Sequence, residues 1–573
     1  MFVSLYSIIS LLCFINLVIC NSQPQVTIPS GTVSGIDITL SNGKIIQAFL
    51  GIPYALPPVG ENRFEEPKPY DKWEGIWNGS TFSRSCMQFS LLSDPLEAVT
   101  GEEDCLYLNI FTPKLPQSST QPLNDVIVFL HGGSFMFGSG NYVIPDYLLA
   151  MHDVVFVYIN YRLAMFGFYS TDDDVVPGNN GLKDQIMALR WIQRNINKFG
   201  GNPRSVTLAG NSAGSASVHF LLLSELGKDL FHKAIMTSGT VLQPWLLLGK
   251  SVSAISRKLA SIAGCPTKST RSMVDCLKTR PSMKLADSFR NFQIWRHLGY
   301  LFGPVIEPPG RNRVLQDDPL VLIRNKKDTI PCLVSVVQDE GFVGLNNFIN
   351  NERILEELDN NFNAIAPYML FYFHKLPENQ YSKFADKIRQ HFFHNQSIIS
   401  DENYPKLIQM LGNRLITSNV EFVIREHTEH NFGPIYYSVF NYSGEHSILK
   451  LYAEPTSKRV LGVSHSDDMI YLMRSTFLDN KLRRPEDMNV SKLMANIWAS
   501  FAKSGKPEIN TTNLTWPAVS HVHKKGIAYL RINSADDLKI QYRYSNDQKA
   551  FNFWNNSLNE FTSSSQKRIN DEF

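Results

Sequence analysis

Three continuous apolar runs mark the first half of the chain. Residues 126–130, 154–159 and 205–209 are short, rich in β-branched side chains and bounded by turn residues, which is typical of strands buried on both faces. Residues 181–199 and 215–223 carry no helix breaker and predict helices. Strands that alternate with helices predict an α/β fold with a mostly parallel central sheet covered by helices on both faces.

The two ends of the chain follow other patterns. Residues 27–47 alternate apolar and polar positions between glycines, which predicts a small antiparallel sheet near the N-terminus. Beyond residue 239 the pattern is helical and irregular. Within it, residues 331–339 and 435–440 indicate further buried strands, and residues 488–501 a last strong helix. No linker-like stretch interrupts residues 21–573, so we expect one domain there.

The composition is that of an ordinary globular protein. Of 573 residues, 43% are hydrophobic and 19% charged, and the net charge of +2 gives no reason to expect nucleic acid as a partner. No phosphate loop or dinucleotide fingerprint is present, so no cofactor is expected. The pairs His391 and His394, and His427 and His430, lack an obvious third ligand. A solvated helix face is therefore the better interpretation than a metal site.

The first twenty residues predict export. Residues 2–20 are apolar and are followed by polar Asn21, which is typical of a cleavable signal peptide; a short N-terminal anchor is the alternative. No other stretch reaches 18 uninterrupted apolar residues, so no stable membrane anchor is expected in the mature chain. The tail, residues 570–573, resembles a lumenal retrieval signal. Its last residue differs from the usual form, and secretion is expected.

Cysteine and asparagine positions agree with an extracellular compartment. Two of the seven cysteines lie in the leader, while Cys86 with Cys105 and Cys265 with Cys276 form local pairs that two disulfides would close. Cys332 is left over inside an apolar run, which favours a buried, inert thiol. In an exported chain, surface sequons are candidate glycosylation sites; they occur here at Asn78, Asn395, Asn441, Asn489, Asn510, Asn513 and Asn555.

A serine between two glycines is the candidate reactive centre. The pentapeptide Gly-Asn-Ser-Ala-Gly at 210–214 stands between a predicted strand and a predicted helix, which is the context of a nucleophile elbow. Its glycines permit a tight turn and the close approach of neighbouring elements. Such a turn would place the Ser212 hydroxyl above the helix N-terminus, where a developing oxyanion is favoured. A purely structural turn of small residues is the alternative.

An ordered series of short motifs accompanies this pentapeptide, from about residue 49 to residue 517. It includes Glu103 to Asn109, His131-Gly-Gly, Asn160-Tyr-Arg162, Gly178 to Gln185, Phe199 to Pro203, Asp339-Glu-Gly341 and Gly462 to His465. The series resembles type-B carboxylesterases and cholinesterases of the α/β-hydrolase fold over nearly the whole mature chain. The motifs at 178–185 and 462–467 in particular resemble insect esterases.

The resemblance implies a catalytic triad in the chain order serine, acid, histidine. Ser212 would be the nucleophile, His465 the base that accepts its proton, and Glu340 the carboxylate that orients His465 through Nδ1. Asp339 is the local rival of Glu340, but the family's acid matches the middle residue of Asp-Glu-Gly. Fourteen histidines are present, so spacing alone would not select His465.

The resemblance also implies the groups around the triad. The backbone N–H groups of Gly133, Ser134 and Ala213 would form the oxyanion hole. Ser134 departs from the glycine or alanine common at its position, and its bulk would narrow the acyl or alcohol pocket. The remaining matches place Ser238 and Asp468 in hydrogen bonds behind the histidine, Trp245 in the acyl pocket, and Arg63–Glu103 and Arg162–Asp184 in structural ion pairs.

The expected substrate follows partly from what the chain lacks. Cholinesterases hold a quaternary ammonium with a tryptophan in the first disulfide loop and a glutamate before the nucleophile. Here residues 87–104 contain no tryptophan, and residue 211 is asparagine. We therefore expect a serine carboxylic ester hydrolase that forms an acyl-enzyme with small, neutral, apolar esters.

Two other functions remain as alternatives. One is a juvenile hormone esterase-like or odorant-ester-degrading enzyme. The other is a catalytically inactive, neuroligin-like adhesion protein. The complete triad and the missing second apolar span argue against adhesion, because function in this fold depends on the site.

Overall fold

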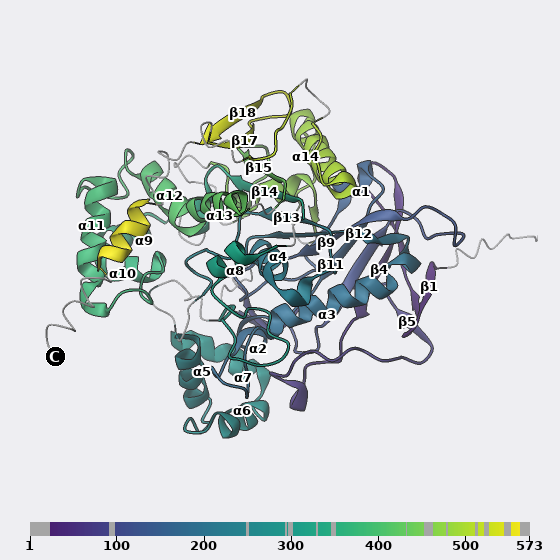
Figure 1. Cartoon of the computed structure of the whole chain (residues 1–573), viewed down its shortest axis with the longest axis horizontal. Coiled ribbons are helices and arrows are strands. Elements are labelled where there is room, and N and C mark those ends of the chain that lie inside the picture. The colour runs from purple at the N-terminus through teal and green to yellow at the C-terminus, as the bar shows by residue number, and fades with distance from the viewer. Residues whose placement is uncertain are drawn as a thin grey trace, which may run out of the picture.

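Eleven strands of the described residues form one sheet through the centre of the computed structural model (Figure 1). The structure describes residues 23–90, 98–247, 251–292, 295, 302–327, 330–344, 351–430, 433–451, 462–476, 479–509, 514–520, 526–543 and 552–561. The strands follow the order β18 (Leu538–Arg543), β17 (Ile527–Ile532), β15 (Ile435–Phe440), β14 (Cys332–Val337), β13 (Lys233–Thr237), β12 (Gly201–Asn211), β9 (Asn124–Leu130), β11 (Val155–Ile159), β8 (Tyr107–Thr112), β4 (Ile45–Pro53), β3 (Ile36–Thr39).

Parallel pairing joins neighbouring strands of this sheet from β11 to β17. The strands at both ends pair antiparallel. The predicted strands at 126–130, 154–159, 205–209 and 435–440 are all present, and the one at 331–339 is shorter than predicted. The mostly parallel α/β architecture inferred from the sequence is therefore confirmed.

The predicted small N-terminal sheet is also present. β1 (Gln25–Ile28) and β2 (Gly31–Ser34) pair antiparallel, and β5 (Ile76–Asn78) joins β2 in parallel. The later part of residues 27–47 forms β3 and the start of β4, which extend the large sheet instead. Two further short pairs are β6 (Gln88–Ser90) with β7 (Ala98–Thr100), and β10 (Val143–Ile144) with β16 (Arg474–Ser475).

Side chains alternate between two apolar cores on the faces of the large sheet. In β9, Val126 and Val128 belong to one buried cluster, and Ile127 and Phe129 to the other. Both sets are almost fully buried, which explains why a central strand appears in the sequence as a continuous apolar run. The second cluster also contains Trp498, which stacks on Phe129.

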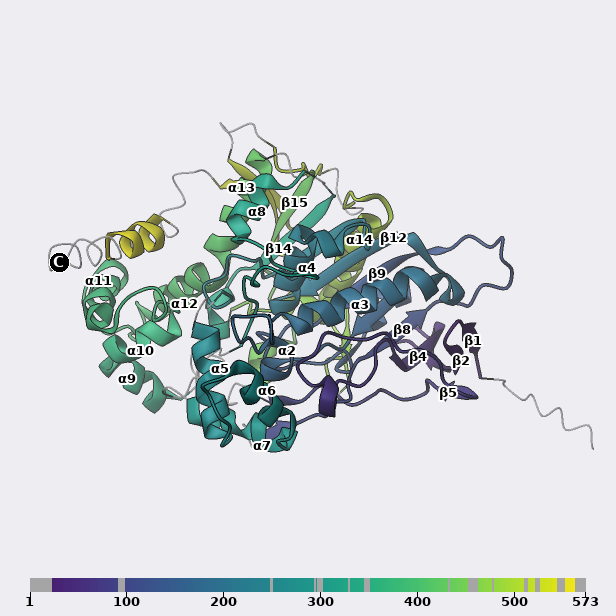
Figure 2. The same cartoon turned by 60° about the horizontal axis from the view of Figure 1, so that its bottom comes forward.

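Helices cover both faces and extend the fold on one side. The helices at one end, α9 to α12, lie far from β1 and β5 in both views (Figures 1 and 2). The α-helices are α1 (Asp146–Met151), α2 (Ala164–Phe168), α3 (Asn180–Asn195), α4 (Ala213–Leu223), α5 (Ser251–Ile262), α6 (Thr270–Lys278), α7 (Ser282–Asp287), α8 (Pro319–Asn325), α9 (Glu352–Asn360), α10 (Phe362–Met369), α11 (Tyr381–Phe393), α12 (Tyr404–Gly412), α13 (Ser418–Glu429) and α14 (Pro485–Ser504).

The three helices predicted at 181–199, 215–223 and 488–501 correspond to α3, α4 and α14. α3 ends at Asn195, and residues Ile196–Phe199 continue it as a tighter 3₁₀ turn. That turn stops at Gly200, whose φ of 84° is easily reached by glycine. Of the described helices, none is long and apolar enough to cross a membrane.

Both predicted disulfides are formed, Cys86–Cys105 and Cys265–Cys276. Cys332 is a free, buried thiol in β14, and burial raises its pKa to about 12. Among the sequons, Asn78, Asn395, Asn489 and Asn555 are exposed, and Asn441 is partly buried. The predicted signal peptide, the tail at 570–573, Asn510 and Asn513 lie outside the described residues.

Candidate active site

The predicted elbow connects β12 to α4, and it requires glycine for close packing. Ser212 takes φ 58° and ψ −122°, a strained conformation for a residue with a side chain. A Cβ atom at Gly210 would overlap the carbonyl oxygen of Gly214, and one at Gly214 would overlap that of Leu130 at the end of β9. The glycines therefore let strand, turn and helix approach closely, while the serine itself makes the sharp turn.

The predicted acid and base are in direct contact. His465 Nδ1 lies 2.6 Å from Glu340 Oε2, and the other carboxylate oxygen accepts the backbone N–H of Val337 at 2.9 Å. Glu340 is 1% exposed and His465 7%. An ionised carboxylate only accepts hydrogen bonds, so this contact places a proton on Nδ1; in the neutral imidazole Nε2 is then the acceptor. The pairing of Glu340 with His465 follows the prediction.

Asp339, the rival acid, has a different role. Its backbone N–H donates to Val463 O at 3.0 Å, and its carboxylate accepts the Val463 N–H at 2.9 Å. A Cβ atom at Gly462 would overlap this carboxylate. Asp339 thus holds the loop that presents His465, one residue away from the acid that contacts the imidazole.

A second contact joins the histidine loop to the elbow. The Ser466 hydroxyl donates to Asn211 Oδ1 at 2.6 Å, and the Asn211 amide donates to Thr237 Oγ1 at 3.1 Å. Asn211 precedes Ser212 and Ser466 follows His465, so this bond ties the immediate neighbours of nucleophile and base together. No hydrogen bond joins the described side chains of Ser212 and His465 directly. Such catalytic bonds are often long before substrate binds.

The glycine-rich loop after β9 packs against the elbow. A Cβ atom at Gly132 would lie 2.9 Å from Ser212 Cβ. Gly133 has φ 108° and Ser134 φ 56°, so the loop turns its backbone through left-handed conformations directly beside the nucleophile. The backbone N–H groups of Gly133, Ser134 and Ala213 donate no hydrogen bond to any described residue. They are therefore available as donors.

Ser238 and Asp468 are buried, but the predicted hydrogen bonds are not formed among the described residues. The Ser238 hydroxyl and both carboxylate oxygens of Asp468 have no partner there. Burial raises the pKa of Asp468 to about 7, the nearby Glu340 charge adds to the rise, and His465 opposes it. Asp468 therefore lies near the acid and base and interacts with them through its charge, and its role behind the histidine stays a prediction.

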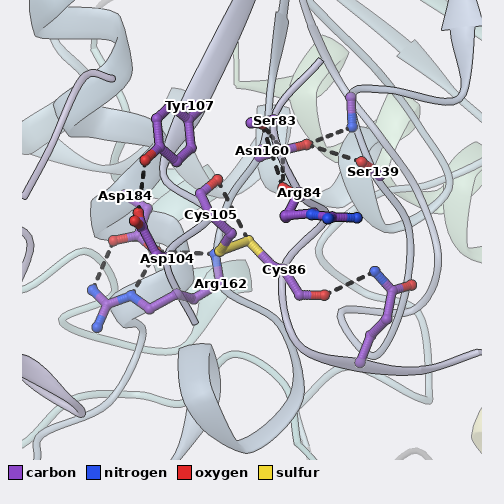
Figure 3. Close-up of a disulfide and its surroundings, with 12 residues drawn as sticks. Ser83, Arg84, Cys86, Asp104, Cys105, Tyr107, Ser139, Asn160, Arg162 and Asp184 are labelled. Atoms are coloured by element: carbon purple, nitrogen blue, oxygen red, sulfur yellow. Dashed lines mark hydrogen bonds and ion pairs between the residues drawn. A yellow bond between two sulfur atoms is a disulfide. The ribbon is translucent and has the colours of Figure 1, made fainter. Parts of the chain in front are cut away.

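The two predicted ion pairs are present away from the triad. Arg63 binds Glu103 at 2.5 and 2.6 Å and also donates to the backbone carbonyls of Leu277 and Arg280. Arg162 contacts Asp184 through two nitrogens at 2.8 and 2.7 Å, and Figure 3 shows this pair beside the first disulfide. These contacts connect segments that are separated in the sequence.

Trp245 is nearly buried, and its indole N–H donates to Leu415 O at 3.2 Å. Its predicted place in an acyl pocket is untested by these contacts. Of the histidine pairs, His427 is buried against His219, with their Nε2 atoms 2.7 Å apart, and His391 stacks on Phe553. The solvated face expected for His427 is therefore wrong, because α13 packs against α4 there. In the described part of the chain, no group of three or more His, Cys, Asp or Glu is arranged to hold a metal.

A sequence profile of the carboxylesterase family matches residues 22–554. The chain belongs to this carboxylesterase family. Esterase FE4 of Myzus persicae is 39% identical over 511 residues, which cover 88% of each chain. A carboxylic ester hydrolase of Bombus ignitus is 35% identical over 549 residues, 95% of this chain and 96% of that one.

Solved structures agree with the sequence relatives. The crystal structure of juvenile hormone esterase from Manduca sexta, with OTFP covalently attached, matches with a TM-score of 0.80 and 26% identity. The match covers 94% of this chain and 100% of that one. The fold is therefore that of an α/β hydrolase, and this carboxylesterase is a carboxylic ester hydrolase.

The roles of three contributors to the carboxylesterase site, Asn211, Asp339 and Ser466, were missed in the sequence. From the sequence, Asn211 was interpreted only as a neutral residue beside the nucleophile, and Asp339 only as a rival acid. Each lies next to a predicted triad residue, which is a usable signal, as is the position of Ser466 beside His465. Their partners depend on how two loops approach each other in space, and local pattern does not encode that approach.

Proposed function

We propose that Ser212, His465 and Glu340 hydrolyse neutral, apolar carboxylic esters through an acyl-enzyme. The observation that carries the proposal is the 2.6 Å contact of His465 Nδ1 with Glu340, beside a serine in the strained elbow. This contact fixes the imidazole tautomer whose Nε2 can accept a proton from the serine. The covalent attachment of OTFP in the Manduca sexta esterase supports nucleophilic chemistry in this fold.

The reaction proceeds in two halves. In the first, His465 accepts the Ser212 proton as Oγ bonds to the ester carbonyl carbon. The resulting oxyanion lies toward the N–H groups of Gly133, Ser134 and Ala213, and collapse expels the alcohol with the proton from His465. In the second half, water repeats the attack on the acyl-enzyme and releases the acid. Glu340 stabilises the imidazolium in both halves and keeps its own charge.

Replacing the nucleophile tests the proposal. Ser212→Ala is expected to reduce ester turnover by several orders of magnitude and to abolish covalent labelling by an organophosphate. Ser217→Ala, on the same helix, is the matched control and should retain both, because its hydroxyl contacts Gln185 instead. Turnover near the parent level in Ser212→Ala would overturn the assignment.

The natural substrate belongs to the same proposal. Residue 211 is neutral and its amide is engaged by Ser466 and Thr237, so it supplies no anion for a cationic alcohol. A panel of short and long acyl esters, choline esters and juvenile hormone should show kcat/KM highest for a neutral ester. Juvenile hormone as the best substrate would favour the hormone-esterase alternative, and preference for a choline ester would contradict the neutral class.

We further propose that the protein is a single-domain, secreted, glycosylated enzyme. The two disulfides and the four exposed sequons described above support an oxidising compartment. Expression in insect cells should give enzyme in the medium that begins near residue 21 and loses mass on deglycosylation. Retention of all activity inside the cells would favour the lumenal alternative.

A further inference from the structure

A cavity of about 540 Å³ lies among the helices, and the triad residues do not line it. Its lining comes from the segment between β13 and α5, the start of α8, the helix at 552–561 and a helical turn that joins α12 to α13, together with residues near 171, 305 and 374. This volume is in the range of pockets that hold small organic ligands. The cavity is therefore large enough for a ligand other than the ester at Ser212.

Arg414 contributes a buried positive charge to this cavity. It is 8% exposed, and its guanidinium donates to the backbone carbonyls of Leu370 at 2.9 Å and Phe371 at 3.3 Å. No carboxylate in the described part of the chain forms an ion pair with it, and burial lowers its pKa to about 10. The guanidinium also lies over the Trp554 ring, 5.2 Å from its centroid, which stabilises the cation without neutralising it. Buried arginines are usually paired with an anion, and no such anion is present among the described residues.

His374 also lines the cavity, but its ring nitrogens do not face the open space. Neither of its ring nitrogens is accessible to solvent, and neither has a hydrogen-bond partner among the described residues. Asp172 and Asp318 line the cavity too, but both residues are exposed, as is Lys375. The exposed rim of the cavity therefore carries both acidic and basic side chains, whereas the buried charge in its lining is the guanidinium of Arg414.

The backbone at Arg414 is also unusual. Residues Asn413–Thr417 form a single π-helical turn between α12 and α13. Such turns are uncommon and are frequent at functional sites, because the extra residue redirects side chains from the regular helix. Arg414, the second residue of this turn, lies in the cavity lining.

The walls of the cavity define the rest of the ligand. Val241, Leu242, Leu247, Val252 and Val305 give it a mainly aliphatic surface. A guanidinium recognises a carboxylate through two parallel N–H groups, and aliphatic walls recognise an alkyl chain. We propose that this cavity binds an alkyl carboxylate, with the carboxylate on Arg414 and the chain along Val241, Leu247 and Val305.

Binding of decanoate to the full-length chain tests this site. The protein is first labelled at Ser212 with an organophosphate, which blocks the catalytic centre. Titration calorimetry should then show one decanoate per chain, with an affinity at least about tenfold higher than that for 1-decanol, because the alcohol lacks the charge. Decanol binding as tightly as decanoate, or the absence of decanoate binding to the labelled protein, would overturn the proposal.

Variants locate the site within the chain. Arg414→Gln should weaken decanoate at least about tenfold, while Arg483→Gln, which removes an exposed arginine paired with Asp479, should leave the affinity unchanged. Equal binding by Arg414→Gln and the parent would contradict the assignment. Leu247→Trp, which fills the cavity from a partly buried wall, should abolish binding and decides the question if Arg414→Gln does not fold. Retained binding in Leu247→Trp would place decanoate elsewhere.

Discussion

At the residue scale, the contact between Ser466 and Asn211 links the two halves of the catalytic machinery. The strained elbow fixes Ser212, and the Asp339 loop fixes His465. The 2.6 Å bond between their neighbours adds a direct link between these two segments. Ser466 itself has φ 72°, so its backbone already leaves the conformations that most side chains prefer.

Removing this hydroxyl should affect catalysis more than stability. Ser466→Ala is expected to lower kcat roughly tenfold with little change in KM, because small misplacements of catalytic groups are costly. Ser466→Gly is the matched variant, since it also lacks the hydroxyl but suits the left-handed backbone. Similar losses of kcat in both variants would identify the hydrogen bond as the cause. If steady-state kinetics show parent activity in both, the positioning role is wrong.

The buried carboxyl group of Asp468 makes a contribution to folding stability that depends on pH. Its pKa is about 7 in the folded protein, against an ordinary value of 3.8, because of burial and the Glu340 charge. Between these values the folded state holds a proton that the unfolded state has released, so this group destabilises the fold as pH rises. The charges of Glu340 and His465 also act on Asp468, so this pH effect depends on all three side chains of the site.

Asp468→Asn should remove that dependence. Relative to the parent, its thermal midpoint should improve between pH 4 and pH 8, with a free-energy difference of at most about 4 kcal/mol across that range. The exposed Asp536→Asn serves as control and should show no such trend. A stability difference that is independent of pH would show that Asp468 is ionised in the folded protein throughout.

At the element scale, the site depends on how closely α4 approaches β9 and β12. The Gly214 position touches the Leu130 carbonyl, and Gly210 touches Gly214. Neither glycine has a positive φ; they are required because there is no space for a side chain. The geometry of the elbow thus depends on the close packing of β9, β12 and α4.

Gly214→Ala should separate these elements. The added Cβ would overlap backbone that cannot rotate away, so we expect a loss of roughly 1–3 kcal/mol of stability and at least about 100-fold of activity. Gly310→Ala is the matched control, because its Cβ would have 3.8 Å to the nearest atom and its φ is not positive. Chemical denaturation and ester turnover measure both effects. Parent-like turnover in Gly214→Ala would show that the turn tolerates a wider approach.

The sequence predicted the elements more fully than their contacts. The continuous apolar runs of β9 and β11 identify strands because burial on both faces leaves no polar positions. The same rule does not assign β3 to the large sheet, since edge pairing depends on where distant strands lie. The triad was predictable through its motifs, whereas the Ser466 bond and the His219–His427 contact join residues more than 200 positions apart.

At the scale of the whole molecule, Arg63 connects distant parts of the chain. It pairs with Glu103 near the first disulfide and donates to carbonyls at the end of α6, beyond residue 276. Both charged side chains are more than 90% buried. The arginine therefore holds the helices around the second disulfide against the N-terminal part of the fold.

Arg63→Met should loosen this connection. Leaving Glu103 buried without its cation is expected to cost about 3–5 kcal/mol. Arg483→Met, in an exposed pair with Asp479, should leave the unfolding midpoint unchanged. Denaturant unfolding followed by tryptophan fluorescence compares the two, and similar midpoints for both variants would show that the carbonyl and ion-pair contacts of Arg63 carry little stability.

The free thiol of Cys332 has a practical use. It lies in β14, between β13 and β15, so a reagent reaches it when the central sheet opens. Every other cysteine in the described part of the chain is already bonded in a disulfide. The rate at which a maleimide modifies the untreated enzyme would therefore report how often the middle of the molecule comes apart, with no engineered label.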